Sequence, residues 1–190
     1  MRRIGLLGGT FNPPHIGHLW LGETAFDQLK LDEIWFLPVG DPPHKSEQTI
    51  TAVSHRLHMT HLAIQDRPHF VLKETDATRE PPHSTISLLK LLHEQNHNSQ
   101  FWLLIGGDSL RDFHKWIAPQ EILKHCRIGA LPRPGSKINW ETLNTAVPTL
   151  KAKIDWLDGP TVDISRFANL ERTIGHMQAA NESELAVFVA

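Results

Sequence analysis

The fold of this sequence is decided by the stretch Ile4-Gly5-Leu6-Leu7-Gly8-Gly9-Thr10-Phe11-Asn12-Pro13-Pro14-His15-Ile16-Gly17-His18. Its first four residues form a short apolar run that ends at two glycines, which is typical of a buried strand. Beyond the prolines, apolar residues recur at roughly helical spacing (Ile16, Leu19, Phe26 and Leu29). The stretch therefore predicts a strand, a glycine turn and a helix in direct succession, with the helix beginning near residues 15–17.

The glycine turn has the features of a phosphate-binding loop. Gly8 and Gly9 let the backbone approach a ligand closely, and Thr10 and Phe11 can supply backbone N–H groups and a hydroxyl. The helix that follows directs the positive end of its dipole to the same place. Together these features predict a site for an anionic phosphate group.

Two histidines, His15 and His18, lie three residues apart and share one face of the first helical turn. Imidazoles beside backbone amides can hold a phosphate while its charge changes. Because the chain contains 13 histidines, a chance pair of surface histidines is the alternative interpretation. A metal site is disfavoured because no carboxylate accompanies the pair.

Short apolar runs alternate with amphipathic stretches along the rest of the chain. Further strands are expected at residues 34–37, 70–72, 101–105, 128–131, 154–157 and 161–164, with helices between them. Such alternation predicts an α/β fold with a doubly wound, mostly parallel sheet flanked by helices. Ligands of such sheets bind at the carboxyl ends of strands, where both Gly8-Gly9 and Gly106-Gly107 are expected.

Composition limits the classes of function. The 190 residues are 40% hydrophobic and 21% charged, as expected for one folded domain over residues 1–190. A net charge of −2 disfavours nucleic acid as a partner. No apolar run in the sequence is long enough to cross a membrane, so no membrane partner is expected. A single cysteine, Cys126, excludes an internal disulfide, and a cytoplasmic protein is the simplest expectation.

The stretch from Gly8 to His18 resembles the signature of the nucleotidyltransferase superfamily, whose fold is Rossmann-like. His15-Ile16-Gly17-His18 is also similar to a motif of class I aminoacyl-tRNA synthetases. Those enzymes are far longer and carry a second, lysine-rich signature that this sequence lacks. The resemblance to the synthetases is therefore rejected.

Five further motifs narrow the resemblance. In chain order they are Pro42-Pro43-His44-Lys45, Pro82-His83-Ser84-Thr85, Gly106-Gly107-Asp108-Ser109-Leu110, Lys115-Trp116 and Arg133-Pro134-Gly135. Their order and spacing are similar to those of the bacterial nicotinate-nucleotide adenylyltransferases, over residues 1–135 and faintly to Ser165. This resemblance implies an enzyme of NAD biosynthesis that joins nicotinate mononucleotide to ATP, giving nicotinate adenine dinucleotide and pyrophosphate.

The resemblance also implies roles for individual residues. The catalytic residues would be His18, which stabilises the α-phosphate, and His15, which holds neighbouring phosphate oxygens. ATP would contact Gly8, Gly9, Thr10, Phe11, His15, His18, Gly106, Asp108, Arg133, Ser165 and Arg166. Nicotinate mononucleotide would contact Lys45, Thr85 and Trp116, the last by stacking on the pyridine ring. Mg²⁺ would accompany ATP, with no metal ligand from protein side chains.

Some of these residues also have a purely structural interpretation. Lys45 and Arg133 are equally typical of solvated loops, and Thr85 is a common helix cap. Asp108 lies just beyond a predicted strand, where an acidic residue either caps a helix or accepts hydrogen bonds from ribose hydroxyls.

Two departures from the family pattern leave alternatives open. Asn12 replaces an aspartate, which a turn tolerates. After Ile164-Ser165 the family's Ser-Thr-x-Ile-Arg is absent, so the segment 165–190 is atypical, and Arg166 and Arg172 are candidates for the missing phosphate contact. The alternatives are a nucleotide-binding relative with lost or altered catalysis, and a sister adenylyltransferase for nicotinamide mononucleotide or phosphopantetheine. A homo-oligomer is compatible with the sequence.

Overall fold

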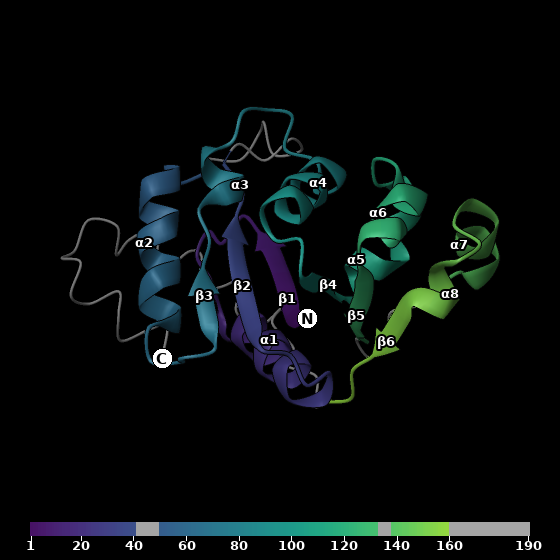
Figure 1. Cartoon of the computed structure of the whole chain (residues 1–190), viewed down its shortest axis with the longest axis horizontal. Coiled ribbons are helices and arrows are strands. Elements are labelled where there is room, and N and C mark those ends of the chain that lie inside the picture. Colours follow the sequence, from purple (N-terminus) through teal and green to yellow (C-terminus); the bar gives the residue numbers. More distant parts are fainter. Residues whose placement is uncertain (41–49, 133–137, 160–190) are drawn as a thin grey trace.

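A single parallel sheet forms the centre of the molecule (Figure 1). The computed structural model describes residues 1–40, 50–132 and 138–159, and within them six strands pair in the order β3-β2-β1-β4-β5-β6. Their bounds are β1 Arg2–Gly9, β2 Glu33–Pro38, β3 Phe70–Leu72, β4 Ser99–Gly106, β5 Arg127–Leu131 and β6 Ile154–Trp156. Every pairing is parallel, which confirms the predicted α/β, doubly wound fold.

The central strands β1 and β4 are buried on both faces, which explains their uninterrupted apolar runs. Successive side chains alternate between the two faces. Leu6 and Leu103 belong to the hydrophobic core on one face, whereas Leu7 and Leu104 belong to the core on the other. The sheet therefore separates two cores, and each must be covered by helices.

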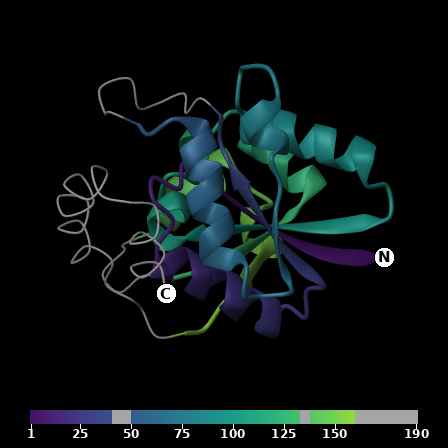
Figure 2. The same ribbon diagram turned by 90° about the vertical axis from the view of Figure 1, so that its left-hand side faces the viewer.

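Helices cover both faces of the sheet. One core receives side chains from α1 (Ile16–Gln28) and α2 (Val53–Ile64), and Figure 2 brings α2 to the front. The other core receives side chains from α4 (Thr85–Gln95), α6 (Pro119–His125), α7 (Trp140–Ala146) and α8 (Leu150–Lys153). Three short elements follow the carboxyl ends of β3 and β4: α3 (Thr75–Thr78), α5 (Gly107–Arg111) and the 3₁₀ helix η1 (Phe113–Lys115).

The strand order reverses between β1 and β4. From β1 the chain moves outward through β2 to β3, then returns to β4 and moves outward through β5 to β6. Because the connections on the two sides leave in opposite directions, a crevice forms at the carboxyl ends of β1 and β4. Gly8 and Gly9 end β1, and Gly106 ends β4 directly before Gly107, so both predicted glycine turns lie there.

The predicted strands differ from the observed ones mainly at their ends. β1 and β4 are longer than the apolar runs because Arg2 and Arg3 pair with Ser99 and Gln100, and backbone pairing needs no apolar side chain. The strand predicted at 161–164 and the segment 165–190 lie outside the described residues. Among the described helices, none has the length and apolar character to cross a membrane.

Candidate active site

A cavity of about 570 Å³ opens at the carboxyl ends of β1 and β4. Two groups of residues line it, and all of them except Asp76 come from the predicted motifs. The glycine group consists of Gly8, Gly9, His15, His18, Gly106 and Asp108. The α4 group, from α3, the start of α4 and the residue after η1, consists of Asp76, His83, Thr85 and Trp116. Motifs that are far apart in the sequence therefore converge on one cavity.

Gly8 and Gly106 keep open a space that no other described part of the chain fills. A Cβ atom at either position would meet nothing within 4 Å. By contrast, a Cβ at Gly5 would lie 2.7 Å from Cδ1 of Ile34, so packing itself requires Gly5. A side chain at Gly8 or Gly106 would obstruct a ligand rather than the fold, as expected where a phosphate approaches the backbone closely.

Thr10 and Phe11, which the sequence predicts as ATP contacts, do not line the cavity. Phe11 is 2% exposed, and its φ of 47° lies in the left-handed region. Its ring lies against Gly9 and meets His18 edge-on, with 4.8 Å between the ring centroids. The side chain of Phe11 thus supports His18 from the core, which leaves the backbone of the loop for a phosphate.

His15 and His18 form a stacked pair where α1 begins. Their ring centroids are 3.6 Å apart and their planes differ by 21°. The backbone N–H of His15 donates to Nδ1 of His18 at 3.1 Å. A neutral imidazole that accepts at Nδ1 carries its proton at Nε2, so His18 offers Nε2–H to a ligand.

The environment of His18 favours the neutral ring. Burial, and secondarily the neighbouring His15, lower the pKa of His18 from 6.5 to about 3. A charged imidazolium would lose water contacts and face a second imidazole. In the unliganded protein at neutral pH, His18 is therefore a neutral hydrogen-bond donor rather than a cation.

The α4 group offers the backbone N–H groups of the first turn of α4 and the aromatic ring of Trp116. Ser84 caps α4, since its Oγ accepts from the backbone N–H of Ser87 at 3.3 Å, and Thr85 opens the helix. The first turn of a helix exposes N–H groups that attract anions. Trp116 follows η1, and its ring packs against Phe113 with 5.3 Å between the centroids. An anionic ring compound would find both contacts here.

Asp108 lies in the first turn of α5, while the cap position belongs to Gly106. Its carboxylate accepts a hydrogen bond from Arg111 at 3.0 Å, and 48% of its side chain is exposed. The residue is thus not a helix cap, and its position on the cavity wall remains compatible with the predicted ribose contact.

Residues 6–170 match the family model of cytidylyltransferase-like proteins. A probable nicotinate-nucleotide adenylyltransferase from Thermomicrobium roseum is 36% identical over 165 residues, which cover 87% of this chain and 77% of that protein. Another, from Oceanobacillus iheyensis, is 38% identical over 172 residues, covering 90% and 84%. The chain belongs to the nicotinate-nucleotide adenylyltransferase family.

A solved structure shares the fold. The nicotinic acid mononucleotide adenylyltransferase of Plasmodium falciparum, complexed with NaAD, aligns with a TM-score of 0.73. The alignment covers 100% of this chain and 95% of that one, at 19% sequence identity. The Rossmann-like architecture and the family predicted from the motifs are both confirmed.

Four of the predicted ligand contacts lie outside the described residues: Lys45, Arg133, Ser165 and Arg166. Their roles in this member of the family stay predictions.

Arg56 does not line the cavity but supports the loop beside it, and the sequence interpretation missed this residue. Its side chain is 1% exposed and donates to three carbonyl oxygens, those of Thr10 at 2.7 Å, Gly40 at 2.9 Å and Thr51 at 3.0 Å. Burial lowers its pKa. It ties the glycine loop to the end of β2 and to the approach to α2. One feature of the sequence could have indicated its burial: Arg56 lies four residues before Thr60, on the same face of a predicted helix.

Asp76 and Arg79 were also missed. Asp76 is 7% exposed, and its carboxylate accepts a hydrogen bond from Nε of Arg79 at 2.6 Å. Burial raises the pKa of Asp76, and Arg79 opposes that rise. The short helix α3 that carries Asp76 has too few residues to show a periodic pattern, so only the aspartate–arginine spacing hinted at the pair.

Replacing Gly106 with alanine is expected to preserve folding and weaken ATP binding. The added Cβ meets no described protein atom, whereas a phosphate or ribose loses its close approach to the backbone, at a cost of roughly tenfold in affinity. Equilibrium unfolding and ATP titration calorimetry on one preparation separate the two effects. Gly5→Ala is the converse control and should lose about 1 kcal/mol of stability. Unchanged ATP affinity in Gly106→Ala would exclude the end of β4 from the site.

Acid is expected to destabilise the protein through His18. The unfolded chain binds a proton at His18 below pH 6.5, whereas the folded chain does not until about pH 3, so stability falls as the pH drops through this window. Within this window the free energy of unfolding falls by about 1.4 kcal/mol for each pH unit. His18→Gln should remove that contribution, and His58→Gln, on the exposed surface of α2, should not. The free energy of unfolding is measured for each protein across this pH range. If it depends on pH in the same way for the parent and for His18→Gln, the lowered pKa of His18 is contradicted.

Proposed function

We propose that this protein transfers the adenylyl group of ATP to nicotinate mononucleotide, releasing pyrophosphate. One observation carries the proposal: the glycine group and the α4 group line the same cavity. The first group suits a polyphosphate and the second suits an anionic aromatic ring, so two substrates of these classes would meet within one site. Family membership supports the same reaction.

The reaction is an in-line displacement. A phosphate oxygen of nicotinate mononucleotide attacks the α-phosphorus of ATP, and the bond from that phosphorus to the oxygen bridging to the β-phosphate breaks. Positioning and charge stabilisation suffice, so no covalent intermediate with the protein is required. Cys126 is unsuited to such a role, because burial raises the pKa of its thiol to about 12.

The neutral His18 would act on the charge that develops at the α-phosphate. Its Nε2–H donates a hydrogen bond that strengthens as negative charge grows in the transition state. The hydrogen bond from His15 N–H fixes the ring orientation in advance, so no reorganisation is needed at the moment of transfer. His15 and the start of α1 would hold neighbouring phosphate oxygens.

We propose that Mg²⁺ enters with ATP. The two carboxylates described on the cavity wall, Asp76 and Asp108, each accept a hydrogen bond from an arginine, which fits a metal carried mainly by substrate phosphates and water. When bound, the ion would neutralise the charge of the leaving pyrophosphate.

Small molecules are the partners we propose, in the cytoplasm. The net charge of −2 supports the absence of a nucleic-acid partner. A homo-oligomer is compatible with the sequence, and a measurement of molecular mass in solution tests for it.

A pyrophosphate-release assay tests the proposed reaction. ATP and Mg²⁺ are combined with nicotinate mononucleotide, nicotinamide mononucleotide or phosphopantetheine in turn. Release with the first and formation of the dinucleotide are expected. Binding of ATP without release in any mixture would favour a relative that has lost catalysis, and release with phosphopantetheine would favour the sister enzyme.

His18→Ala is expected to lower turnover by about 10²–10³, the usual cost of removing one preorganised donor to a transition state. The ATP dissociation constant should change only several-fold, because the donor acts mainly on charge that develops during transfer. Steady-state kinetics and calorimetry provide the two values. Turnover close to that of the parent would remove His18 from the mechanism.

Trp116→Ala is expected to weaken binding of nicotinate mononucleotide by about 1–2 kcal/mol, the scale of aromatic stacking. The affinity for ATP should stay within about twofold, because Trp116 belongs to the α4 group and not to the glycine group. For comparison, a loss of about 1.4 kcal/mol in binding free energy would lower the affinity tenfold. Trp156→Ala is the matched control, because Trp156 is 48% exposed and lies in β6, outside the cavity lining. Equal losses for the two variants would indicate a general effect on folding instead of stacking.

A further inference from the structure

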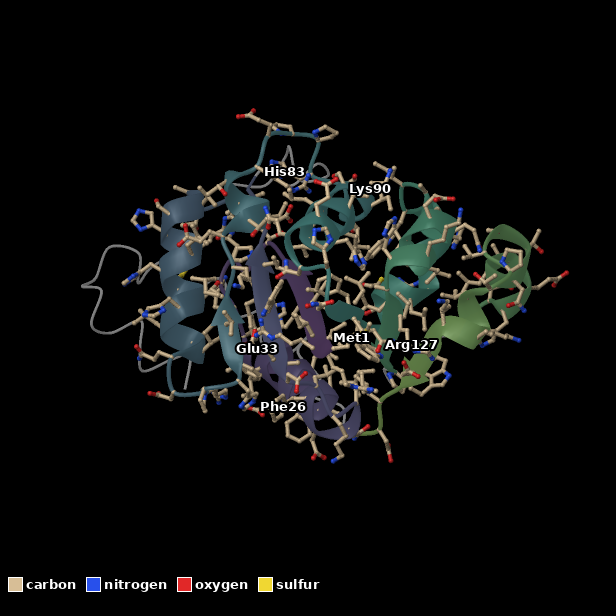
Figure 3. All side chains as sticks on the ribbon, in the orientation of Figure 1. Met1, Phe26, Glu33, His83, Lys90 and Arg127 are labelled. Carbon is tan, nitrogen blue, oxygen red and sulfur yellow. The ribbon has the colours of Figure 1, made fainter. Side chains whose placement is uncertain are left out.

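His83 occupies the wall of the cavity directly before the cap of α4. Figure 3 labels it where the chain passes from α3 to α4. Its side chain is 4% exposed and lines the cavity. The motif that contains it was noted in the sequence, but neither the proposed reaction nor the predicted contacts use this residue.

The Nδ1 atom of His83 faces a carboxylate that lies too far away for a hydrogen bond. This atom is buried and has no hydrogen-bond partner within the described part of the chain. Oδ1 of Asp76 lies 3.8 Å from it, which is beyond hydrogen-bonding distance. A neutral ring leaves this atom buried and unpaired, which is costly, whereas an imidazolium would face the opposite charge of Asp76.

Arg79, the neighbouring cation, is already committed. Its Nε donates to Asp76 at 2.6 Å, and its two terminal nitrogens donate to Pro82 O, Ser87 Oγ and Ser84 O at 2.9, 2.9 and 3.2 Å. The ion pair is therefore neutral as a unit and holds the start of α4 in place. No nitrogen of Arg79 lacks a protein partner, so His83 is the side chain beside this pair that can still take up positive charge.

The ring of His83 is held in a preformed position. A Cβ atom at Gly40 would lie 3.1 Å from Cε1 of His83 and 2.6 Å from the carbonyl oxygen of Ala77. Glycine at position 40, two residues after β2, therefore leaves room for both the ring and the backbone of α3. A ring fixed in this way loses little freedom when it binds a ligand.

We propose that His83 selects the acid form of the mononucleotide by pairing, as an imidazolium backed by Asp76, with the nicotinate carboxylate. This inference rests on the proposed function and adds a specificity-determining residue to it. Burying a carboxylate is costly unless a positive group meets it. The amide of nicotinamide mononucleotide carries no charge and gains much less from the pair.

The proton count distinguishes the two substrates. A neutral ring that directs Nδ1–H towards Asp76 presents a lone pair at Nε2, which repels a carboxylate. Only the doubly protonated ring donates from Nε2 to the nicotinate while Nδ1–H faces Asp76. The pairing with nicotinate mononucleotide therefore requires a proton on both nitrogens of His83, whereas binding of the amide does not.

The charged groups beside His83 are Asp76 of α3 and Arg79 of the loop that follows. Gly40 and Ala77, which also contact or flank the ring, bring no charge. The remaining titratable side chains described on the cavity wall are His15 and His18 of α1 and Asp108 of α5. They meet both mononucleotides equally, because they lie in the glycine group and not in the α4 group.

Titration calorimetry in two buffers of different ionisation enthalpy measures the proton uptake. The protein binds nicotinate mononucleotide and nicotinamide mononucleotide in separate titrations near neutral pH. Both ligands carry the same 5′-phosphate, so the titration of that group cancels in the difference. We expect the acid form to take up more protons than the amide form, by up to about one proton. Equal uptake would overturn the proposal.

His83→Asn tests the residue itself. The variant should lose the difference in uptake, and its preference for the acid form, as the ratio of kcat/KM values, should fall at least about tenfold. Because Nδ1 makes no hydrogen bond to the described chain, folding should survive the change, and His83→Gln is a second variant if it does not. The KM for ATP should be unchanged.

His69→Asn is the matched control. His69 also lies beside a carboxylate, with Nε2 at 2.9 Å from Glu23, but it does not line the cavity, so its loss should leave the preference intact. An undiminished acid preference in His83→Asn would overturn the proposal while the reaction stands. If instead the proposed reaction is wrong, the parent protein itself will release no pyrophosphate from ATP and nicotinate mononucleotide.

Discussion

Hydrogen bonding between β1 and β4 is the constraint on which the site depends. These strands are neighbours in space although about ninety residues separate them in the chain, and the helices that follow them cover opposite faces of the sheet. The two glycine ends must then face one another across a crevice. The glycine turn after β1, the stacked histidines and the start of α5 are all placed by this single pairing.

The cavity handles charge differently in its two parts. In the glycine group, the residues proposed to receive phosphates are backbone amides and a neutral His18, so the proposed site buries no fixed cation there. In the α4 group, Arg79 pairs with Asp76, and His83 lies beside that pair as the residue proposed to meet an acid ligand. A polyphosphate and an aromatic acid can thus share one pocket without a permanent excess of positive charge, which fits the chain's net charge of −2.

The sequence predicted the sheet and the motif residues better than the contacts that hold them. Apolar runs such as 101–105 indicated strands because parallel strands are buried on both faces. Thr85 and Trp116 could be assigned to one site only through a family resemblance, since no local pattern brings them together. Arg56 was out of reach because it binds carbonyls from three separate segments. The helices α3, α5 and α8, with four or five residues each, are too short to show periodicity.

The guanidinium of Arg56 has a consequence for how members of this family can diverge. It binds the carbonyls of Gly40 and Thr51 together, so these two positions are held close to one another. Closing a longer connection costs only about 0.6 kcal/mol for each doubling of its length. A change in the length of the connection between these anchors would therefore cost little stability and would leave in place the glycine loop, which the same side chain holds through Thr10.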